Sequence, residues 1–288
     1  MRRGQNSNLA ESALDSMSAP KPAQPGFGGR GGAKRRFLLP KEHGAYAELG
    51  FPLLTVLLLG VPGLGTVALS LAVVCLFLMH EPALVLLGHR GTRLQREAGG
   101  LAMRLVSALA LAGLGFGCAG LWLSPWSALW GALVPIAFVI ALLPMTATRR
   151  EKTLPGELLA AAALVAGSVP VALSASITVP ATATVSIVWG VTFALGTLAV
   201  RLTVMSAKAA TASLRTVTLL LTLGTVLAAV WLSTLPEPPS RAALAVLPGA
   251  ILALALTLFR IPPRRLRIVG WSIAVSNLMT LALLLLLL

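Results

Sequence analysis

Hydrophobic segments and short polar gaps alternate along the chain from about residue 44 to the C-terminus. Each segment is close to the ~20 apolar residues that a helix needs to cross a hydrocarbon core of ~30 Å, although the first and fourth are shorter. The nine segments are approximately 44–60, 65–87, 101–122, 126–143, 156–174, 184–204, 214–234, 240–259 and 268–288. This pattern predicts an all-α fold, a polytopic integral membrane bundle of about nine transmembrane helices.

Basic residues fall in alternate gaps between these segments. All but one of the 23 lysines and arginines lie before the first segment or around the gaps that follow the second, fourth, sixth and eighth segments. The exception is Arg241. Because cytoplasmic loops retain Lys and Arg, we expect the N-terminus to be cytoplasmic and the C-terminus to lie outside.

The composition agrees with a membrane protein. Hydrophobic residues make up 57% of the chain, charged residues only 11%, and the mean hydropathy is +0.88. Soluble domains have roughly a quarter of their residues charged. The net charge of +14 is confined largely to short loops at one predicted face and to the N-terminal segment. The topology rule and attraction to anionic lipids account for such loops, so we expect membrane lipids as partners and no nucleic acid.

Residues 1–36 have a different composition, rich in Gly, Pro, Ser and Arg, with no apolar run. A segment of this kind cannot offset its ordering entropy. We therefore expect a disordered basic cytoplasmic tail over 1–36 and a nine-helix transmembrane domain over 37–288. The tail also does not have the apolar stretch of a secretory signal peptide. Met17 is a second candidate start of translation, and the sequence does not choose between it and Met1.

Titratable residues gather at the predicted cytoplasmic ends of the first two segments. The three histidines of the chain and three glutamates lie there, namely His43, His80, His89, Glu42, Glu48 and Glu81. Ionisable groups close to hydrocarbon are costly and usually mark a site or a buried polar network. Glu48 lies seven residues after Lys41, roughly 10 Å deeper, and must be either partnered or protonated. The alternative to a site is pairing that merely holds the bundle together.

A second cluster follows the second segment, where His89, Arg93 and Arg96 would share a face if the helix continued. Such a cationic surface could hold a lipid phosphate, a diphosphate or another anion, and the alternative is an ordinary solvated basic loop. We expect His43, Arg90 and Arg93 to face a common anion-binding pocket, with Glu81 fixing the imidazole tautomer. The full set of candidate ligand-binding residues is Glu42, His43, Tyr46, Glu48, His80, Glu81, His89, Arg90, Arg93 and Arg201.

Recognisable catalytic signatures are absent from the sequence. Histidine and carboxylate side chains suit several metals, but no spacing in the chain resembles HExxH or CxxC, so no metal site is assigned. The chain also contains no GxSxG motif, no P-loop and no dinucleotide fingerprint. No cofactor is assigned, and the sequence leaves open whether the protein is an enzyme, with a non-enzymatic role favoured.

Small residues indicate where helices pack. Gly113, Gly117 and Gly120 lie on one side of the third segment, where they would let a neighbouring helix approach closely. The last segment ends in six leucines, 283–288, and we expect its outer half to face lipid.

The run Pro40-Lys41-Glu42-His43-Gly44-Ala45 followed by the aromatic Tyr46 resembles the hallmark of the YwiC-like family of bacterial polytopic membrane proteins. Tyr46 stands where that family usually has tryptophan. The likeness extends to Glu81-Pro82, to Gly156-Glu157-Leu158 and to Val200-Arg201, so that it covers roughly residues 37–215. The resemblance implies a multi-pass protein of the bacterial cytoplasmic (inner) membrane and implies no established activity.

Nine spans with a cytoplasmic N-terminus also resemble the architecture of UbiA-type intramembrane prenyltransferases. Those enzymes bind Mg²⁺ and a prenyl diphosphate through two Asp-rich motifs, whereas this chain has one aspartate, Asp15. Glu48, Glu81 and Glu157 would have to replace the missing oxygen ligands.

Our leading hypothesis is a cytoplasm-facing polar cavity that accommodates a lipid-like ligand, such as an isoprenoid, or an anionic small molecule. The first alternative is a proton-coupled transporter, with Glu48 as the titrating group and Ser276 and Asn277 as the main polar residues at mid-membrane. The others are a UbiA-like transferase with atypical ligands and a non-catalytic membrane scaffold. The ligand and the oligomeric state are left open.

Overall fold

The computed structural model of the chain describes residues 43–205, 211–236, 240–259 and 266–288. Every regular element within these ranges is helical. The elements are α2 (His43–Leu59), α3 (Leu64–Leu86), α4 (Thr92–Trp122), α5 (Trp126–Ala147), α6 (Leu154–Ala166), α7 (Ser168–Ser174), α8 (Val179–Met205), α9 (Thr211–Ser233), the 3-10 helix η1 (Ser240–Val246), α10 (Leu247–Leu258) and α11 (Leu266–Leu287). The predicted tail over 1–36 and Glu42 lie outside the described residues.

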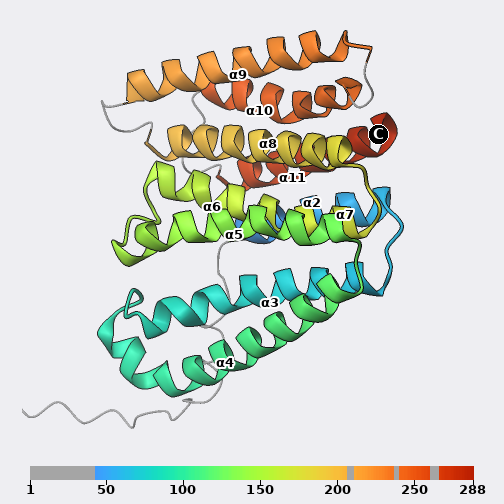
Figure 1. Cartoon of the computed structure of the whole chain (residues 1–288). Coiled ribbons are helices and arrows are strands. Elements are labelled where there is room, and N and C mark those ends of the chain that lie inside the picture. Colours follow the sequence, from blue (N-terminus) through green and yellow to red (C-terminus); the bar gives the residue numbers. More distant parts are fainter. Residues whose placement is uncertain (1–42, 206–210, 237–239, 260–265) are drawn as a thin grey trace, which may run out of the picture. The chain divides into compact units, whose positions relative to one another are not determined.

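Eight helical stretches of the described chain are long and apolar enough to cross a membrane, and α2 contributes a shorter apolar helix, Gly44–Leu59. Two of the eight are composite, since α6 with α7 and η1 with α10 each form one stretch. The helices lie side by side in Figure 1, with α3 next to α4 at one edge and α9 next to α10 at the other. The predicted all-α polytopic membrane bundle is therefore confirmed. Its sidedness stays a prediction.

The third span is longer than the hydropathy pattern predicted. Helix α4 begins at Thr92 rather than near residue 101 and has 31 residues, which makes it roughly 46 Å long at 1.5 Å per residue. Its first turns therefore extend beyond a hydrocarbon core of ~30 Å. Leu94 of this extension packs against the buried pair Val85 of α3 and Ala102 of α4, so the polar start of α4 is packed on its neighbour.

The centre of the bundle is a stack of aromatic rings that joins α2 to α8. Trp189 is fully buried, with ring centroids 5.4 Å from Phe51 and 5.3 Å from Phe193. The Trp189 indole Nε1 donates to Thr55 Oγ1 at 2.9 Å, which satisfies the one polar atom of the indole.

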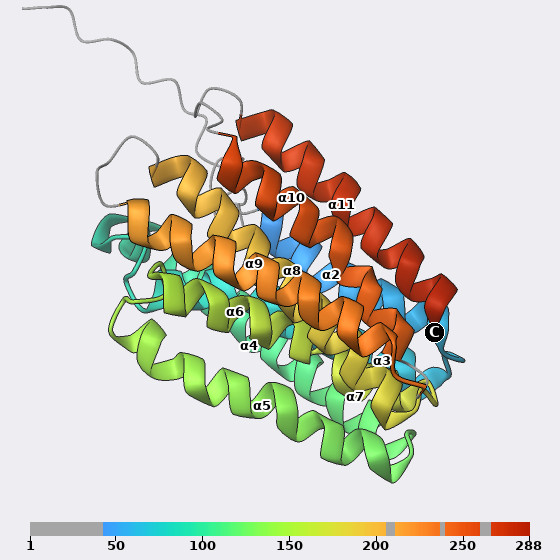
Figure 2. The same cartoon turned by 90° about the horizontal axis from the view of Figure 1, so that it is seen from above.

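Figure 2 shows the bundle from above, with α5 and α11 at opposite sides.

The small-residue face predicted on the third span packs against α3. A Cβ at Gly120 would lie 2.9 Å from the backbone nitrogen of Leu69, and one at Gly113 would lie 3.5 Å from Cys75 Cβ. These distances show how closely the two backbones approach.

The expectation that the terminal leucines face lipid is wrong in part. Leu284 is fully buried, whereas Leu286 is exposed. A uniform leucine run hides which side of a helix is buried, because only the neighbouring helices decide it.

Candidate functional site

The end of α3 and the loop that follows it carry the first charged contact of the site. Glu81 is buried on α3 and pairs with Arg90, whose Nε donates to Glu81 Oε2 at 3.1 Å and whose Nη2 contacts Glu81 Oε1. The guanidinium thus engages both carboxylate oxygens, a geometry that gives specificity as well as energy. Glu81 was expected to orient the imidazole of His43; its partner among the described residues is Arg90, and the expected contact with His43 stays a prediction because the His43 side chain lies outside them.

Glycine ends α3 and turns the chain so that this pair forms. Gly88 has a φ of 71°, a backbone conformation that glycine adopts without strain. Its N–H donates to Val85 O, and the His89 N–H donates to Leu84 O, both at 3.0 Å. These two bonds form a Schellman motif, which terminates a helix. The helix therefore does not continue through His89, so the predicted shared face of His89, Arg93 and Arg96 is wrong.

His89 connects two loops that are distant in sequence. Its Nδ1 lies 3.7 Å from Oε2 of Glu151, in the α5–α6 loop. The His89 side chain is 8% exposed, and neither of these two atoms has a hydrogen-bond partner within the described residues. At 3.7 Å the contact is too long for a hydrogen bond. The pair therefore brings the α3–α4 and α5–α6 loops together and leaves two buried polar atoms unsatisfied.

Arg201 makes the third charged contact. Its Nη1 donates to Glu157 Oε2 at 2.9 Å, and its Nη2 donates to the backbone oxygen of Lys152 at 3.3 Å. Glu157 lies in the first turn of α6, next to Gly156. A Cβ at Gly156 would lie 2.5 Å from the backbone oxygen of Arg150, so only glycine allows the loop to fold this closely onto the helix. Arg201 thereby ties the end of α8 to the start of α6.

The three contacts share one end of the bundle. The α3–α4 loop, the α5–α6 loop and the end of α8 all lie at the left in Figure 1. They are connected through neighbouring residues, because His89 precedes Arg90 and Glu151 precedes Lys152. We call these residues the charged network: Glu81, His89, Arg90, Glu151, Lys152, Glu157 and Arg201. By the distribution of basic residues, this end is the predicted cytoplasmic one.

The motif that begins at Pro40 approaches this network through its last residue, Tyr46. The Tyr46 ring packs edge-on against Phe77 of α3, one helical turn before Glu81, with centroids 5.1 Å apart. Glu48 is half-buried on the same helix and is also partnered. Helix α2 begins at His43, but the side chain of His43 and all of Glu42 lie outside the described part of the chain. Whether His43 shares a pocket with the charged network stays a prediction.

Two candidate residues point away from the network. The Arg93 side chain is 91% exposed and pairs with Glu97, four residues further along α4, at 3.0 Å. His80 is exposed on α3. The structure thus brings Glu81, His89, Arg90 and Arg201 together but leaves Arg93 and His80 on the surface. No group of three His, Cys, Asp or Glu side chains within the described ranges is arranged to hold a metal ion.

The candidate ligand-binding set did not include Glu151 and Glu157, the partners of His89 and Arg201, although Glu157 was considered as a replacement oxygen ligand. The signal was present, because carboxylates are scarce in this chain, with nine Asp and Glu among 288 residues. Each carboxylate near the membrane therefore needed an assigned partner.

Comparison with known proteins gives one family. The family model described as YwiC-like protein matches residues 39–173. The match includes the Pro40–Ala45 motif, Glu81-Pro82 and Gly156-Glu157-Leu158, and it ends before Arg201, which the sequence resemblance had included. No curated protein and no solved structure matches the chain, so the UbiA likeness gains no support. Over residues 39–173 the chain is therefore similar to the YwiC-like family of proteins.

Proposed function

We propose that the protein binds a phosphate-bearing anionic amphiphile, of the class of an anionic membrane lipid, where the α3–α4 and α5–α6 loops meet. The apolar helices and the family match identify the chain as a multi-pass membrane protein. Arginine and lysine are the side chains that bind phosphate groups. This end of the bundle has an excess of such basic side chains, nearly all of them arginines.

Cations outnumber carboxylates at this end. Residues 81–104, 149–157 and 201 contain the basic residues Arg90, Arg93, Arg96, Arg104, Arg149, Arg150, Lys152 and Arg201, against Glu81, Glu97, Glu151 and Glu157. Three of these glutamates already pair with arginines. Basic residues near an anionic leaflet each contribute about 1 kcal/mol of attraction. The excess of positive charge therefore supports an anionic ligand.

The backbone of Arg149 is the observation that carries the proposal. Its φ is 57°, in the left-handed region. The Arg149 N–H donates to Thr146 O at 3.0 Å and the Arg150 N–H donates to Met145 O at 2.8 Å, which is a Schellman termination of α5. Glycine usually occupies this position, as Gly88 does at the end of α3. A side chain there costs about 1–2 kcal/mol.

An arginine held in a strained conformation supports a functional requirement for its charge, because strain persists where the surroundings or the function demand it. Arg149 is exposed and lies beside Arg150 and Lys152, in the loop that contacts His89. A phosphate at this position would meet three cations presented by one short loop.

The test is Arg149→Gly, which removes the charge and the strain together. We expect the unfolding free energy to stay constant or to rise by up to about 1 kcal/mol, because relief of strain is partly offset by the greater unfolded-state freedom of glycine. The extra thermal stability of the protein in phosphatidylglycerol nanodiscs, relative to phosphatidylcholine nanodiscs, should fall in the variant. Arg149→Lys should retain it.

Adding inorganic diphosphate to the protein in phosphatidylcholine nanodiscs distinguishes a lipid from a soluble anion. A lipid ligand predicts little stabilisation by free diphosphate, whereas a soluble anion predicts stabilisation that Arg149→Gly removes. Equal stabilisation of the wild type and Arg149→Gly by phosphatidylglycerol and by diphosphate would contradict the proposal.

A further inference from the structure

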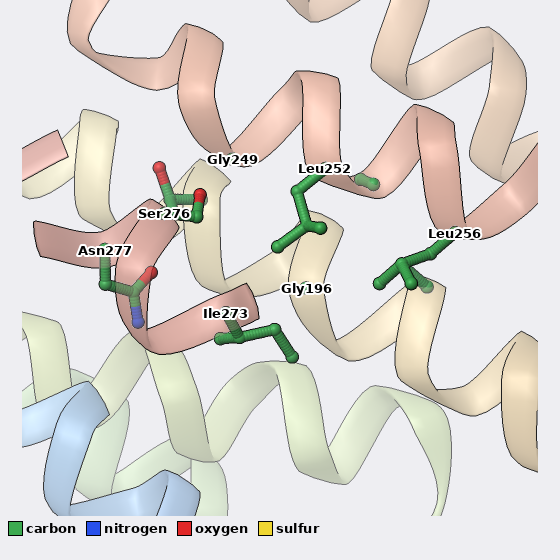
Figure 3. A pocket seen from close by; sticks show the side chains of 10 residues that line it. Gly196, Gly249, Leu252, Leu256, Ile273, Ser276 and Asn277 are labelled. Carbon is green, nitrogen blue, oxygen red and sulfur yellow. The ribbon is translucent and has the colours of Figure 1, made fainter. Parts of the chain in front are cut away.

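A small, mainly apolar hollow with three polar residues lies between α8, α10 and α11, away from the charged network (Figure 3). Its polar lining comes from Thr192 of α8 and from Ser276 and Asn277 of α11. Glycines at positions 196 and 249 also line it, and its volume is about 10 Å³. Thr192 lies nine residues before Arg201, which is roughly 13 Å along the helix.

The hollow lies at the middle of three helical stretches that are long and apolar enough to span a membrane. Thr192 is the central residue of α8, which runs from Val179 to Met205. Gly249 is the central residue of the span Ser240–Leu258, and Ser276 and Asn277 are at the centre of α11. The hollow is therefore lined by the central residues of three spans. Polar groups at this depth are expensive and usually functional.

Two hydroxyl groups in the hollow have no hydrogen-bond partner within the described residues. Thr192 Oγ1 and Ser276 Oγ are both buried and unsatisfied, and Asn277 is 2% exposed.

The hydroxyls of Thr182, Ser186 and Thr280 are unsatisfied as well, whereas several other buried hydroxyls of the described chain bond to their own helix. Thr55, Thr222 and Thr257 each donate to the carbonyl oxygen four residues earlier, at 2.7 Å. An unsatisfied buried polar group costs about 1–3 kcal/mol, so a partner from outside the chain would stabilise Thr192 and Ser276.

We propose that the hollow binds one water molecule, held by the hydroxyls of Thr192 and Ser276 and by the amide of Asn277. A cavity of roughly 10–15 Å³ accommodates one water, and a buried water needs two to four polar partners. A cation is the poorer fit, because no carboxylate lines the hollow and an uncompensated charge at the midplane is costly. The bound water would join α8 to α11 in the middle of the membrane, and this inference does not depend on the proposed lipid site.

Glycine 196 creates the space for the water. A Cβ at Gly196 would meet nothing within 4 Å, whereas one at Gly249 would lie 2.8 Å from Thr192 Cγ2. Gly249 therefore sets the close approach of α10 to α8, and Gly196 leaves room beside it. Gly190, on the same helix, also has open space at its Cβ position but does not line the hollow. The two glycines form a matched pair for substitution.

The experiment compares Gly196→Ala with Gly190→Ala by thermal unfolding of the full-length protein in nanodiscs. A methyl group at position 196 would displace the water and leave its partners unsatisfied. We expect the Tm of Gly196→Ala to fall by at least roughly 2–4 °C relative to Gly190→Ala. If the hollow is dry, the methyl group fills empty space, and Gly196→Ala will be at least as stable as Gly190→Ala, which would overturn the proposal.

A second pair of variants tests the hydroxyl itself. Thr280 Oγ1 is also buried and unsatisfied, but Thr280 does not line the hollow. Thr192→Val should therefore lower the Tm relative to Thr280→Val, because only Thr192 binds the water. Equal effects of the two substitutions would contradict the assignment. A wild-type Tm that is higher in sodium chloride than in choline chloride would indicate that the hollow binds a cation. That result would overturn the proposal that it binds water.

Discussion

Replacing Glu81 by glutamine removes one charge from the pair that ties the α3–α4 loop to α3. The Glu81 side chain is 9% exposed and that of Arg90 is 29% exposed. Breaking a buried ion pair by removing one partner costs about 3–5 kcal/mol, because the remaining charge is uncompensated. Arg90 keeps nearly a third of its exposure and can turn partly toward water, so we expect a smaller loss for Glu81→Gln, about 2–3 kcal/mol.

The double variant Glu81→Gln/Arg90→Gln separates the pair from the other contacts of each residue. With both charges removed no buried charge is left unpaired, so the double variant should be more stable than the sum of the single variants predicts. We expect a coupling of about 2 kcal/mol, which is roughly a 30-fold change in the unfolding equilibrium. The assay is unfolding in mixed micelles by titration with sodium dodecyl sulfate, followed by tryptophan fluorescence.

Arg93 and Glu97 supply the control cycle. They pair at 3.0 Å but are largely exposed, and they lie one helical turn apart. An exposed pair of this kind contributes about 0.3–0.5 kcal/mol. A coupling between Glu81 and Arg90 that is no larger than this control would refute the view that the charged network is enclosed and holds the loops together.

Further predictions concern the loops and the sidedness of the protein. Gly156→Ala should destabilise the protein by about 1–3 kcal/mol in the same assay, because its Cβ would lie 2.5 Å from a backbone oxygen, whereas Gly224→Ala, which has open space, should not. Arg201→Gln should cost about 1–2 kcal/mol, because its guanidinium joins α8 to α6 and to the α5–α6 loop. In a background without native cysteines, a cysteine at Arg93 should react with an impermeant maleimide only from the cytoplasmic side, and one added after Leu288 only from outside.

The number and position of the helices could be predicted because the membrane fixes the length of each apolar segment. The motif at 40–45 likewise predicted the family whose model matches residues 39–173. The start of the third helix was predicted too late. The stretch Thr92–Gly100 is polar, and a hydropathy pattern detects only the part of a helix that is apolar enough to lie within hydrocarbon. Leu94 of the missed stretch packs against the cluster of Val85 and Ala102, so the start of α4 is in contact with α3 although its composition is polar.

The partners in the charged network could not be read from the sequence. Hydropathy gives the level of a residue in the membrane but not the direction in which its side chain points. Arg90 and Arg93 are three residues apart, yet Arg90 pairs with buried Glu81 and Arg93 faces solvent. Gly91 lies between them with a φ of 98° and precedes the first residue of α4, so Arg90 stays in the loop and Arg93 lies on the helix. The presence of a glycine does not by itself predict a positive φ.

The hollow between α8, α10 and α11 was likewise predictable only in part. Ser276 and Asn277 were visible in the sequence as polar residues in an apolar span. Thr192 did not stand out in the sequence, because a threonine in a helix commonly donates its hydroxyl to the carbonyl oxygen four residues earlier. Only the packing of α8 against α10 and α11 shows that this threonine and Ser276 are left without partners.

The most direct test of the central claim is the identity of the lipid that stays bound to the protein during purification. Native mass spectrometry should detect anionic phospholipid or another phosphate-bearing amphiphile on the wild-type protein, enriched over its share of the host membrane. The triple variant Arg149→Gln/Arg150→Gln/Lys152→Gln should lose that enrichment while keeping its wild-type Tm in zwitterionic nanodiscs. Bound lipid in the same proportions as the bulk membrane, unchanged by the triple substitution, would contradict the account.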